Sequence, residues 1–483
     1  MAKDTAEPAP APAATPAATT PAAATPADAA PAEPAGAGMT GASAAAGPSA
    51  AYRAYVLFIL VVVYTFNFID RQIVGILAVP IKADLGLSDT QLSLMGGLAF
   101  ALFYTFLGIP IAMLADRSSR TWIMTAALAI WSAMTAVCGL AQNFLQLFLA
   151  RLGVGVGEAG GVAPAYSLIA DYFPPEKRAR ALSIYSFGIP IGSALGILLG
   201  GVLTTYLGWR AAFIAVGIAG LAIAPIFRLT MREPVRGAHD GANAKTAPAP
   251  LRDVVAALAR KPSFWGLSFG GASASMMGYG LIFWLPSFFV RSYGEALPAF
   301  FAWMPDALVP ANPSSLLYAS YFYATILLIG GVAGMWLGGV VADKYGQAKK
   351  STYAVAPAIA FLATIPFFIV AVLSPSLWVA FPAFLVIQAL SLVWLGPVLA
   401  AFQHLVEPNM RATASAVFLF VNNLIGIGLG NLAIGALSDG LNAQFGDEAL
   451  RYAILSGTIF YVIAAGLFLV TAPRLKTDWA SAH

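Results

Sequence analysis

Two short loop sequences decide how this chain is organised: AMLADRSSR at residues 112–120 and GVVADKYG at residues 339–346. Each follows a long apolar run, and each places an acid next to a base, Asp116 with Arg117 and Asp343 with Lys344. The second copy comes six apolar runs after the first. A signature that recurs at this interval predicts two halves related as parallel repeats.

The runs around these loops have the composition of membrane-spanning helices. Of the 483 residues, 59% are hydrophobic and only 10% are charged, whereas a soluble domain carries roughly 25% charged residues. A helix needs about 20 apolar residues to cross a bilayer. The sequence therefore predicts an all-α integral membrane protein with twelve transmembrane helices, at about 54–79, 90–115, 121–141, 144–170, 180–206, 210–230, 263–290, 317–342, 352–373, 376–403, 411–437 and 450–472.

Polar stretches divide the chain into its parts. Residues 1–50 are rich in Ala and Pro and lack large apolar side chains, which predicts a disordered tail. This tail also lacks the apolar core of a cleaved signal peptide. Two six-helix bundles are expected at 51–230 and 263–473, joined by a central loop at 231–262 and followed by a tail at 474–483.

The basic residues indicate the orientation of the chain. With both termini on one side, 20 of the 26 Lys and Arg residues fall on that side, and four, Lys82, Arg210, Arg291 and Arg451, fall on the other. The positive-inside rule then places both termini, the central loop and the two signature loops in the cytoplasm. We expect a bacterial inner membrane protein.

Several classes of site are excluded. Cys138 is the one cysteine, so the chain forms no intramolecular disulfide, and with only three histidines beside it we expect no structural zinc site and no other metal site. The spelling GxGxxG at residues 155–160 lies inside a spanning run with no strand before it, so we interpret it as close helix packing. The glycines at every fourth position from Gly188 to Gly200 are interpreted in the same way. No nucleotide-binding lysine motif and no catalytic group of side chains is present, so an enzyme is not expected.

Four charges lie inside the predicted spans: Asp70 and Arg71 in the first, Arg151 and Glu158 in the fourth. Together they cost on the order of 10 to 14 kcal/mol on the insertion scale. Arg151 and Glu158 are almost two helical turns apart, so they share a face into which the first helix can insert a charge. The alternative is an ion-pair cluster that only holds two helices together.

A proton switch is expected from the charges themselves. With both acids ionised the cluster is neutral, and each proton taken up leaves one arginine without a counter-charge, which attracts an anion. Candidate residues for the surrounding cavity are aromatic or polar, and ordinary helix packing is the alternative for each: Tyr64, Phe66, Asn67, Ser275, Tyr279, Trp284, Phe288, Thr325, Gln388, Asn422 and Asn423.

The two signature loops are candidates for a cytoplasmic gate. Asp116, Arg117, Arg120, Asp343 and Lys344 place acids and bases together in both halves, where charge pairs and helix-end dipoles can latch one conformation. The alternative is that the bases only orient the chain in the membrane. An excess of basic residues on the cytoplasmic side would not by itself require Asp116 or Asp343.

Four stretches resemble spinster lipid transporters of the major facilitator superfamily: NFIDR at 67–71, RLGVGVGEA at 151–159, APAYSLIADYF at 163–173 and RARALSIYSFGIPIGS at 178–193. The signature loops also resemble those of this superfamily, although Ala112 and Ser119 stand where glycine is common. The resemblance implies a bacterial homologue in a family that moves lysolipids or phosphorylated sphingoid lipids. It also implies that Asp70 and Glu158 act as protonation switches, with Arg71 and Arg151 as headgroup or switch partners.

We therefore expect a proton-responsive secondary transporter of an amphipathic anionic lipid that works by alternating access. It would act as a monomer among membrane lipids, with protons as the coupling ion, no other cofactor and no nucleic-acid partner. A multidrug or small organic-anion carrier of the same superfamily is the alternative within transporters. A non-transporting receptor or a lipid scramblase is the alternative outside them.

Overall fold

The structure, a computed structural model, describes residues 48–236, 250–305, 309, 314–346, 349–406 and 410–479. The predicted disordered tail lies outside the described residues up to residue 47, as do residues 237–249 of the predicted central loop. Within the described ranges, the side chains of residues 116, 175, 176, 179, 183, 342, 343, 403, 411 and 412 are left out.

The first half begins where Ser49 caps α1, its hydroxyl accepting a hydrogen bond from the amide of Tyr52 at 3.2 Å. A second cap, the reciprocal pair Ser88 and Gln91, starts the second span. The elements of this half are α1 (Ala50–Leu85), α2 (Asp89–Ser93), a π-helical turn η1 (Leu94–Leu98), α3 (Ala99–Arg117), α4 (Arg120–Cys138), α5 (Phe144–Glu158), α6 (Val162–Tyr172), α7 (Pro175–Ser186) and α8 (Gly188–Thr230).

The second half is built in the same way, with some spans formed by one long helix and others divided into two shorter helices. Its elements are α9 (Leu251–Ala259), α10 (Pro262–Tyr293), α11 (Ala296–Phe300), α12 (Ser315–Val341), η3 (Ala342–Gly346), α13 (Thr352–Leu373), α14 (Leu377–Leu392), α15 (Leu395–Gln403), α16 (Arg411–Phe445), η5 (Gly446–Glu448), α17 (Ala449–Gly457), α18 (Ile459–Thr471) and α19 (Leu475–Asp478).

The helices account for all twelve predicted spans. Nine stretches of the described chain are long and apolar enough to cross a membrane. Two of these, Arg180–Thr230 and Thr413–Thr471, contain 51 and 59 residues, so each has the length of two crossings. In the first, Gly208 turns the chain with a φ of 81° between the two predicted spans. The remaining crossing is the fourth span, which is divided into the shorter helices α5 and α6.

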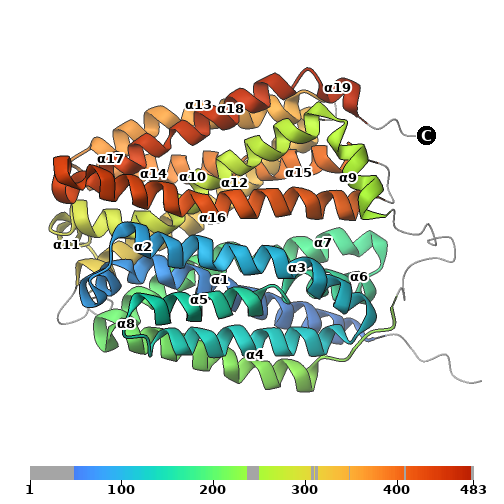
Figure 1. Cartoon of the computed structure of the whole chain (residues 1–483), viewed down its shortest axis with the longest axis horizontal. Coiled ribbons are helices and arrows are strands. Elements are labelled where there is room, and N and C mark those ends of the chain that lie inside the picture. Colours follow the sequence, from blue (N-terminus) through green and yellow to red (C-terminus); the bar gives the residue numbers. More distant parts are fainter. Residues whose placement is uncertain are drawn as a thin grey trace, which may run out of the picture. The chain divides into compact units, whose positions relative to one another are not determined.

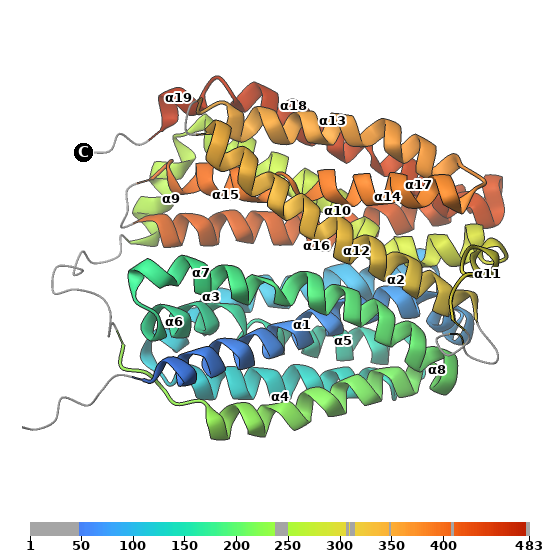
Figure 2. The ribbon, with the colours of Figure 1, turned by 180° about the vertical axis from the view of Figure 1, so that it is seen from behind.

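The helices form two bundles, α1–α8 and α10–α18, which lie side by side (Figures 1 and 2). The start of α1 lies at the same end as α6, α7, α9 and α19, and we call this the near end. The opposite end, with α2, α11 and α17, is the far end. Because each bundle has an even number of crossings, the described chain starts and finishes at the near end.

Small residues allow the helices inside a bundle to approach closely. A Cβ built on Gly157 would lie 2.5 Å from the backbone nitrogen of Trp131 in α4, and one on Gly196 would lie 2.9 Å from Cα of Ile69 in α1. Such contacts leave no room for a methyl group. The interpretation of the glycine-rich stretches as helix packing is confirmed, because the backbones themselves touch at these positions.

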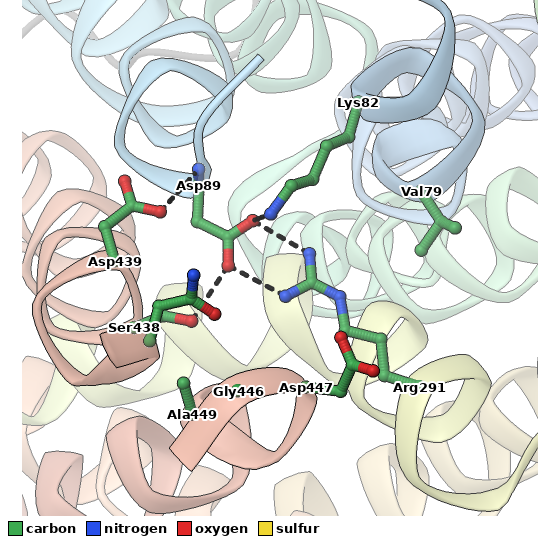
Figure 3. A pocket seen from close by; sticks show the side chains of 10 residues that line it. Val79, Lys82, Asp89, Arg291, Ser438, Asp439, Gly446, Asp447 and Ala449 are labelled. Atoms are coloured by element: carbon green, nitrogen blue, oxygen red, sulfur yellow. Dashed lines mark hydrogen bonds and ion pairs between the residues drawn. The ribbon is translucent and has the colours of Figure 1, made fainter. Parts of the chain in front are cut away.

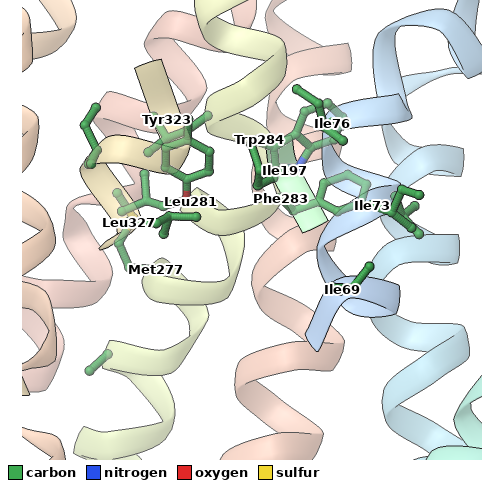
Figure 4. Packing of buried hydrophobic residues seen from close by; sticks show 14 of the residues in the cluster. Ile69, Ile73, Ile76, Ile197, Met277, Leu281, Phe283, Trp284, Tyr323 and Leu327 are labelled. Atoms are coloured by element: carbon green, nitrogen blue, oxygen red, sulfur yellow. The ribbon is translucent and has the colours of Figure 1, made fainter. Parts of the chain in front are cut away.

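Apolar side chains fill the centre of the interface between the bundles. Figure 4 shows Phe283 and Trp284 of α10 beside Ile73 and Ile76 of α1 and Ile197 of α8. A Cβ on Gly75 of α1 would lie 3.1 Å from the carbonyl oxygen of Phe283, so α1 and α10 cross almost in backbone contact. The second span, from α2 to α3, packs in the same way along α16.

The glycine contacts make a direct prediction about stability. Gly217 of α8 faces the backbone of α4, and its Cβ would lie 2.5 Å from the nitrogen of Ala136 and 2.6 Å from the oxygen of Ser132. Because backbone cannot move aside as a side chain can, Gly217→Ala should destabilise the protein by about 1–3 kcal/mol. A lower thermal midpoint of the detergent-solubilised protein would show this. Gly466→Ala on α18 is the control, since its Cβ would meet nothing within 4 Å. Equal midpoints in the two variants would contradict the prediction.

Candidate functional site: a buried charge cluster between α1 and α5

The site is built around an interruption in the fourth span. Helix α5 ends at Glu158, and α6 begins at Val162, so Glu158 occupies the last turn of a helix inside the bundle. On the other side, α1 continues to Leu85, six residues past the predicted end of the first span. Asp70 therefore lies near the middle of its helix and is 1% exposed, whereas the shorter predicted span put it toward one end.

The four predicted intramembrane charges come together here. Arg71 donates from Nε to Oε2 of Glu158 at 2.7 Å, and Glu158 is fully buried. Arg151 donates from Nη1 to the backbone oxygen of Asp70 at 3.4 Å. The first and fourth helices thus meet as the spacing of Arg151 and Glu158 predicted, with Arg71 as the inserted charge.

The cluster keeps unused hydrogen-bonding capacity. Among the described residues, Oδ1 of Asp70, Oε1 of Glu158, Nη2 of Arg71 and Nε of Arg151 are buried and have no hydrogen-bond partner. Buried polar atoms are usually paired, and an unpaired one costs about 1–3 kcal/mol. Oxygen acceptors and nitrogen donors left over at one point form a site where a proton or an anion can be accommodated.

Three aromatic rings surround Arg71, and none of them was among the predicted cavity residues. Its guanidinium carbon lies 5.1 Å from the ring centre of Phe68, 4.8 Å from that of Phe100 and 4.7 Å from that of Tyr104. We call these three rings the aromatic cage. Phe68 stands three positions before Arg71, and Phe100 and Tyr104 stand four apart on the second span, which are the spacings of one helix face. This spacing was the available signal.

Three predicted cavity residues lie next to the cluster. Asn67 is 2% exposed and adjoins Glu158. Tyr64 stacks on Tyr185 of α7 with ring centres 4.3 Å apart. Tyr279, from α10 in the other bundle, packs against the small apolar cluster of Phe100, Ala101 and Ile427. The charge cluster therefore reaches the interface between the bundles.

The other predicted cavity residues lie elsewhere in this conformation. Trp284 and Phe288 are fully buried in the packed core, where the Trp284 indole donates to the oxygen of Asn431 at 3.2 Å. In this conformation, both side chains pack in the core instead of lining a cavity. The remaining residues contact their own bundle: Phe66 faces Gly220, Ser275 donates to Oδ1 of Asn422 at 2.8 Å, Thr325 donates to the oxygen of Tyr321 at 2.8 Å, Gln388 packs on Gly330, and Asn423 is half-buried on α16.

At the near end, Arg120 is an anchor inside one bundle. Its side chain is 1% exposed and pairs with Asp171 at the end of α6 and with Glu233, whose Oε1 accepts from Nε at 2.7 Å. All three residues belong to the first half and the segment that leaves it. This differs from the expectation that Arg120 takes part in a gate between the halves, because neither of these ion-pair partners belongs to the second bundle.

For the other four predicted gate residues, the described structure shows no ion pair between the two halves. Arg117 is exposed, and Lys344 is exposed with its amine 5.6 Å from the ring centre of Tyr345. The side chains of Asp116 and Asp343 lie outside the described residues. The gate therefore stays a prediction for these four residues.

At the far end, a network of charges joins the two bundles, and the sequence did not point to it. Asp89, at the start of α2, accepts two hydrogen bonds from Arg291 of α10, each 2.8 Å, and one from Ser438 of α16 at 2.8 Å (Figure 3). Lys82 of α1 completes its shell at 2.7 Å. In return, Asp439 of α16 accepts from the amides of Asp89 and Thr90 at 3.0 and 2.7 Å. We call these residues the far-end network.

A comparison with known proteins identifies the architecture. The sequence profile of the Major Facilitator Superfamily matches residues 60–431. The chain belongs to this superfamily. The two bundles, with twelve crossings in the described chain, are thus the fold that the recurring loops predicted.

Relatives narrow the type of transporter. A crystal structure of a bacterial homolog to the human lysosomal transporter Spinster, inward-facing and unoccupied, matches with a TM-score of 0.80 at 32% identity, over 90% of this chain and 100% of that one. An MFS-type efflux pump of Mycolicibacterium smegmatis is 32% identical over 436 residues, 89% of this chain and 95% of the pump. Protein spinster homolog 1 of Xenopus tropicalis is 28% identical over 448 residues, 89% of this chain and 82% of that protein. This superfamily member is an integral multi-pass membrane transporter of the spinster type and not an enzyme.

The near-end anchor predicts a dependence of stability on pH. Burial raises the pKa of Glu233, but hydrogen bonds from the Thr121 amide and from the side chains of Arg120 and Ser119 lower it more, from 4.5 to about 2. The stabilisation by ionised Glu233 is therefore complete above pH 4.5 and is lost as the pH falls toward 2. Glu233→Gln should lower the thermal midpoint most at neutral pH, with a difference from the wild type that shrinks below pH 4.5. Glu295→Gln, at an exposed acid, is the control. A pH-independent difference for Glu233→Gln would contradict this prediction.

The far-end network predicts a change in conformational balance. Removing one partner of a buried charge pair costs about 3–5 kcal/mol, so Asp89→Asn should favour conformations in which the far end is open. Spin labels at Gln142 and Gln444, both exposed at the far end, report this as longer distances in a Cys138→Ala background. Asp84→Asn is the matched control, because Asp84 pairs with Arg210 inside one bundle and both are exposed. Unchanged distances in Asp89→Asn would show that the network does not hold the far end closed.

Proposed function

We propose that this chain is a proton-responsive secondary transporter that moves an amphipathic anionic lipid, of the lysophospholipid or sphingoid-phosphate type, by alternating access. The observation that carries the proposal is the pair of Arg71 and Glu158, buried inside the membrane-spanning part beside the interface of the two bundles. A pair that only fastened two helices would be an expensive device. Glycine contacts already hold α5 against α3 and α4, and α8 against α1.

The proton response is a consequence of charge balance. Asp70 and Glu158 offset Arg71 and Arg151, so the ionised cluster is neutral. A proton on Glu158 removes the partner of Arg71, and a phosphate or similar anion can then take its place at the guanidinium fork. Proton and anion thus enter together, with Asp70 as a second, coupled acceptor. Under this proposal the proton is the coupling ion.

A lipid suits the surroundings better than a small hydrophilic anion. The aromatic cage, Tyr64 and Tyr185 provide rings next to the arginines, and Tyr166 of α6 is 43% exposed within this group. A headgroup at the arginines would leave an acyl chain against rings and apolar helix faces. The likeness to the Spinster homolog supports this choice of substrate class.

Orientation and assembly belong to the same proposal. Among the described residues, Lys82, Arg210, Arg291 and Arg451 belong to loops or helix ends at the far end, and the other basic loops belong to the near end (Figure 1). By the positive-inside rule we place the near end, with both termini, in the cytoplasm of a bacterial inner membrane. One chain contains both bundles and their interface, so a monomer suffices for transport.

A second candidate is a multidrug or small organic-anion carrier. The observation that favours it is the 32% identity to the MFS-type efflux pump of Mycolicibacterium smegmatis, over 95% of that pump. Such a carrier would use the same cluster for a different anion. A receptor or a scramblase would bind lipids without coupled transport.

Flux into proteoliposomes separates these functions. With an imposed proton gradient, a lysophospholipid transporter accumulates labelled lysophosphatidic acid and leaves labelled drugs behind. Flipping of many lipids without a gradient would indicate a scramblase, and binding without flux a receptor. Arg71→Ala and Arg151→Ala should abolish lipid accumulation, and Arg151→Lys should restore it only partly, because an ammonium lacks the guanidinium fork. Undiminished flux in both alanine variants would rule out this site.

The proton switch is tested without any substrate. Glu158→Gln imitates permanent protonation, so it should remove most of the pH dependence of label distances between Lys177 and Lys349, two exposed near-end positions. Adding Asp70→Asn should remove most of what remains. The measurement covers about pH 5 to 8, the range around physiological pH. A double variant that still switches at the wild-type midpoint would mean that the proton is sensed elsewhere.

A further inference from the structure

Phe100 occupies a position between the two buried arginines. Its ring centre lies 4.8 Å from the guanidinium carbon of Arg71 and 6.0 Å from that of Arg151, both within the range of a cation–π interaction. Phe100 is 2% exposed, and Tyr104 stacks on it at 5.2 Å with an angle of 20° between the rings. One ring therefore contacts both cations.

The backbone around Phe100 fixes where this ring lies. Its carbonyl oxygen would be 2.8 Å from a Cβ on Gly155, so α3 and α5 are in backbone contact beside Glu158. The π-helical turn η1 directly precedes α3. Such turns insert an extra residue into a helix and rotate the next segment of it, and they are frequent at functional sites. Phe100 thus has little freedom to move away from the arginines.

Phe100 also reaches the other bundle. It forms a buried apolar cluster with Ala101 and with Ile427 of α16, and Tyr279 of α10 packs on this cluster. In the preceding turn, a Cβ on Gly97 would lie 2.8 Å from the oxygen of Ile427. The ring that contacts both arginines is therefore part of the contact between the bundles.

We propose that Phe100 is a positioning residue for the anion site: its ring holds the guanidinium groups of Arg71 and Arg151 in place when protonation of Glu158 removes the ion-pair partner of Arg71. This inference rests on the proposed function of the arginines. In a buried site, where charges are poorly screened, an arginine that has lost its counter-ion would swing toward the remaining acid. A ring face offers a neutral partner that keeps the guanidinium plane where the headgroup anion can bind.

The proposal predicts the direction in which the pH of switching moves. If the ring stabilises the unpaired arginine, it favours the protonated state of the cluster, so weakening the ring must shift proton-driven switching to lower pH. Other titratable or charged groups around the cluster are the same in every variant: Tyr64, Asp70, Tyr104, Cys138, Tyr166, Tyr185 and Tyr279. A change at position 100 alone is therefore interpretable.

The decisive experiment weakens the negative electrostatic potential of the ring face and keeps the shape of the side chain. Phenylalanines with one, two and three fluorines are placed at position 100 by nonsense suppression, and the switching midpoint is measured from the Lys177–Lys349 label distances without lipid. The midpoint should fall stepwise with fluorination, by roughly one pH unit for three fluorines. The affinity for oleoyl-lysophosphatidic acid should fall about tenfold at pH 5.5 and less at pH 7.5, where Glu158 still holds Arg71.

Matched variants separate a positioning role from a structural one. Phe100→Leu should reproduce the shift, and Phe100→Tyr should behave like the wild type. Phe106→Leu is the control on the same helix, since Phe106 contacts Phe420 of α16, its ring centre 5.5 Å away. A midpoint that is independent of fluorination overturns the inference, as does an equal loss of affinity at both pH values.

The two proposals fail in different ways. If fluorination has no effect while Arg151→Ala abolishes lipid binding, the inference about Phe100 is wrong and the proposed function stands. If fluorination shifts the midpoint while lysophosphatidic acid does not bind the wild type, the ring positions the arginines and the substrate class is wrong.

Discussion

The interaction on which the rest of the structure depends is the ion pair of Arg71 and Glu158 inside the membrane-spanning part. Neither charge is stable at that depth alone, so each requires the other helix at one rotation and one depth. Helix α5 ends at Glu158, and this interruption places the carboxylate beside α1 instead of toward lipid. The pair joins the middle of α1 to the end of α5, and the aromatic cage fills the space around the guanidinium.

Close packing makes this arrangement rigid enough to be specific. In lipid there is little hydrophobic drive between helices, so backbone contact through small residues provides the association. Gly155 meets Phe100 and Gly157 meets Trp131, so α5 is held against α3 and α4, and Gly196 meets Ile69, so α8 is held against α1. Gly155 and Gly157, which match the spelling of a nucleotide-binding motif, bring helices together in this protein. A buried charge pair between such helices has one geometry.

The second span connects the charge cluster to the far end of the molecule. It begins at Asp89 in the far-end network, passes through the π-helical turn and reaches Phe100 and Tyr104 beside Arg71. Along this path it packs on α16 of the other bundle. A change of charge at Arg71 and a change in contact at Asp89 therefore act on one continuous helix, which is the physical requirement for coupling between a proton site and the closure of one face.

The sequence by itself determined the twelve spans, the repeated halves, the family and the four intramembrane charges, because a bilayer imposes length and polarity on each segment locally. It could not assign partners. That Glu158 pairs with Arg71, that Arg120 is held by Asp171 and Glu233 inside one bundle, and that Trp284 and Phe288 lie in the core were decided by helix rotation and depth. The aromatic cage and the far-end network likewise join residues distant in sequence, such as Asp89 and Arg291. Only the tertiary structure brings such side chains within the few ångströms over which charges and rings interact.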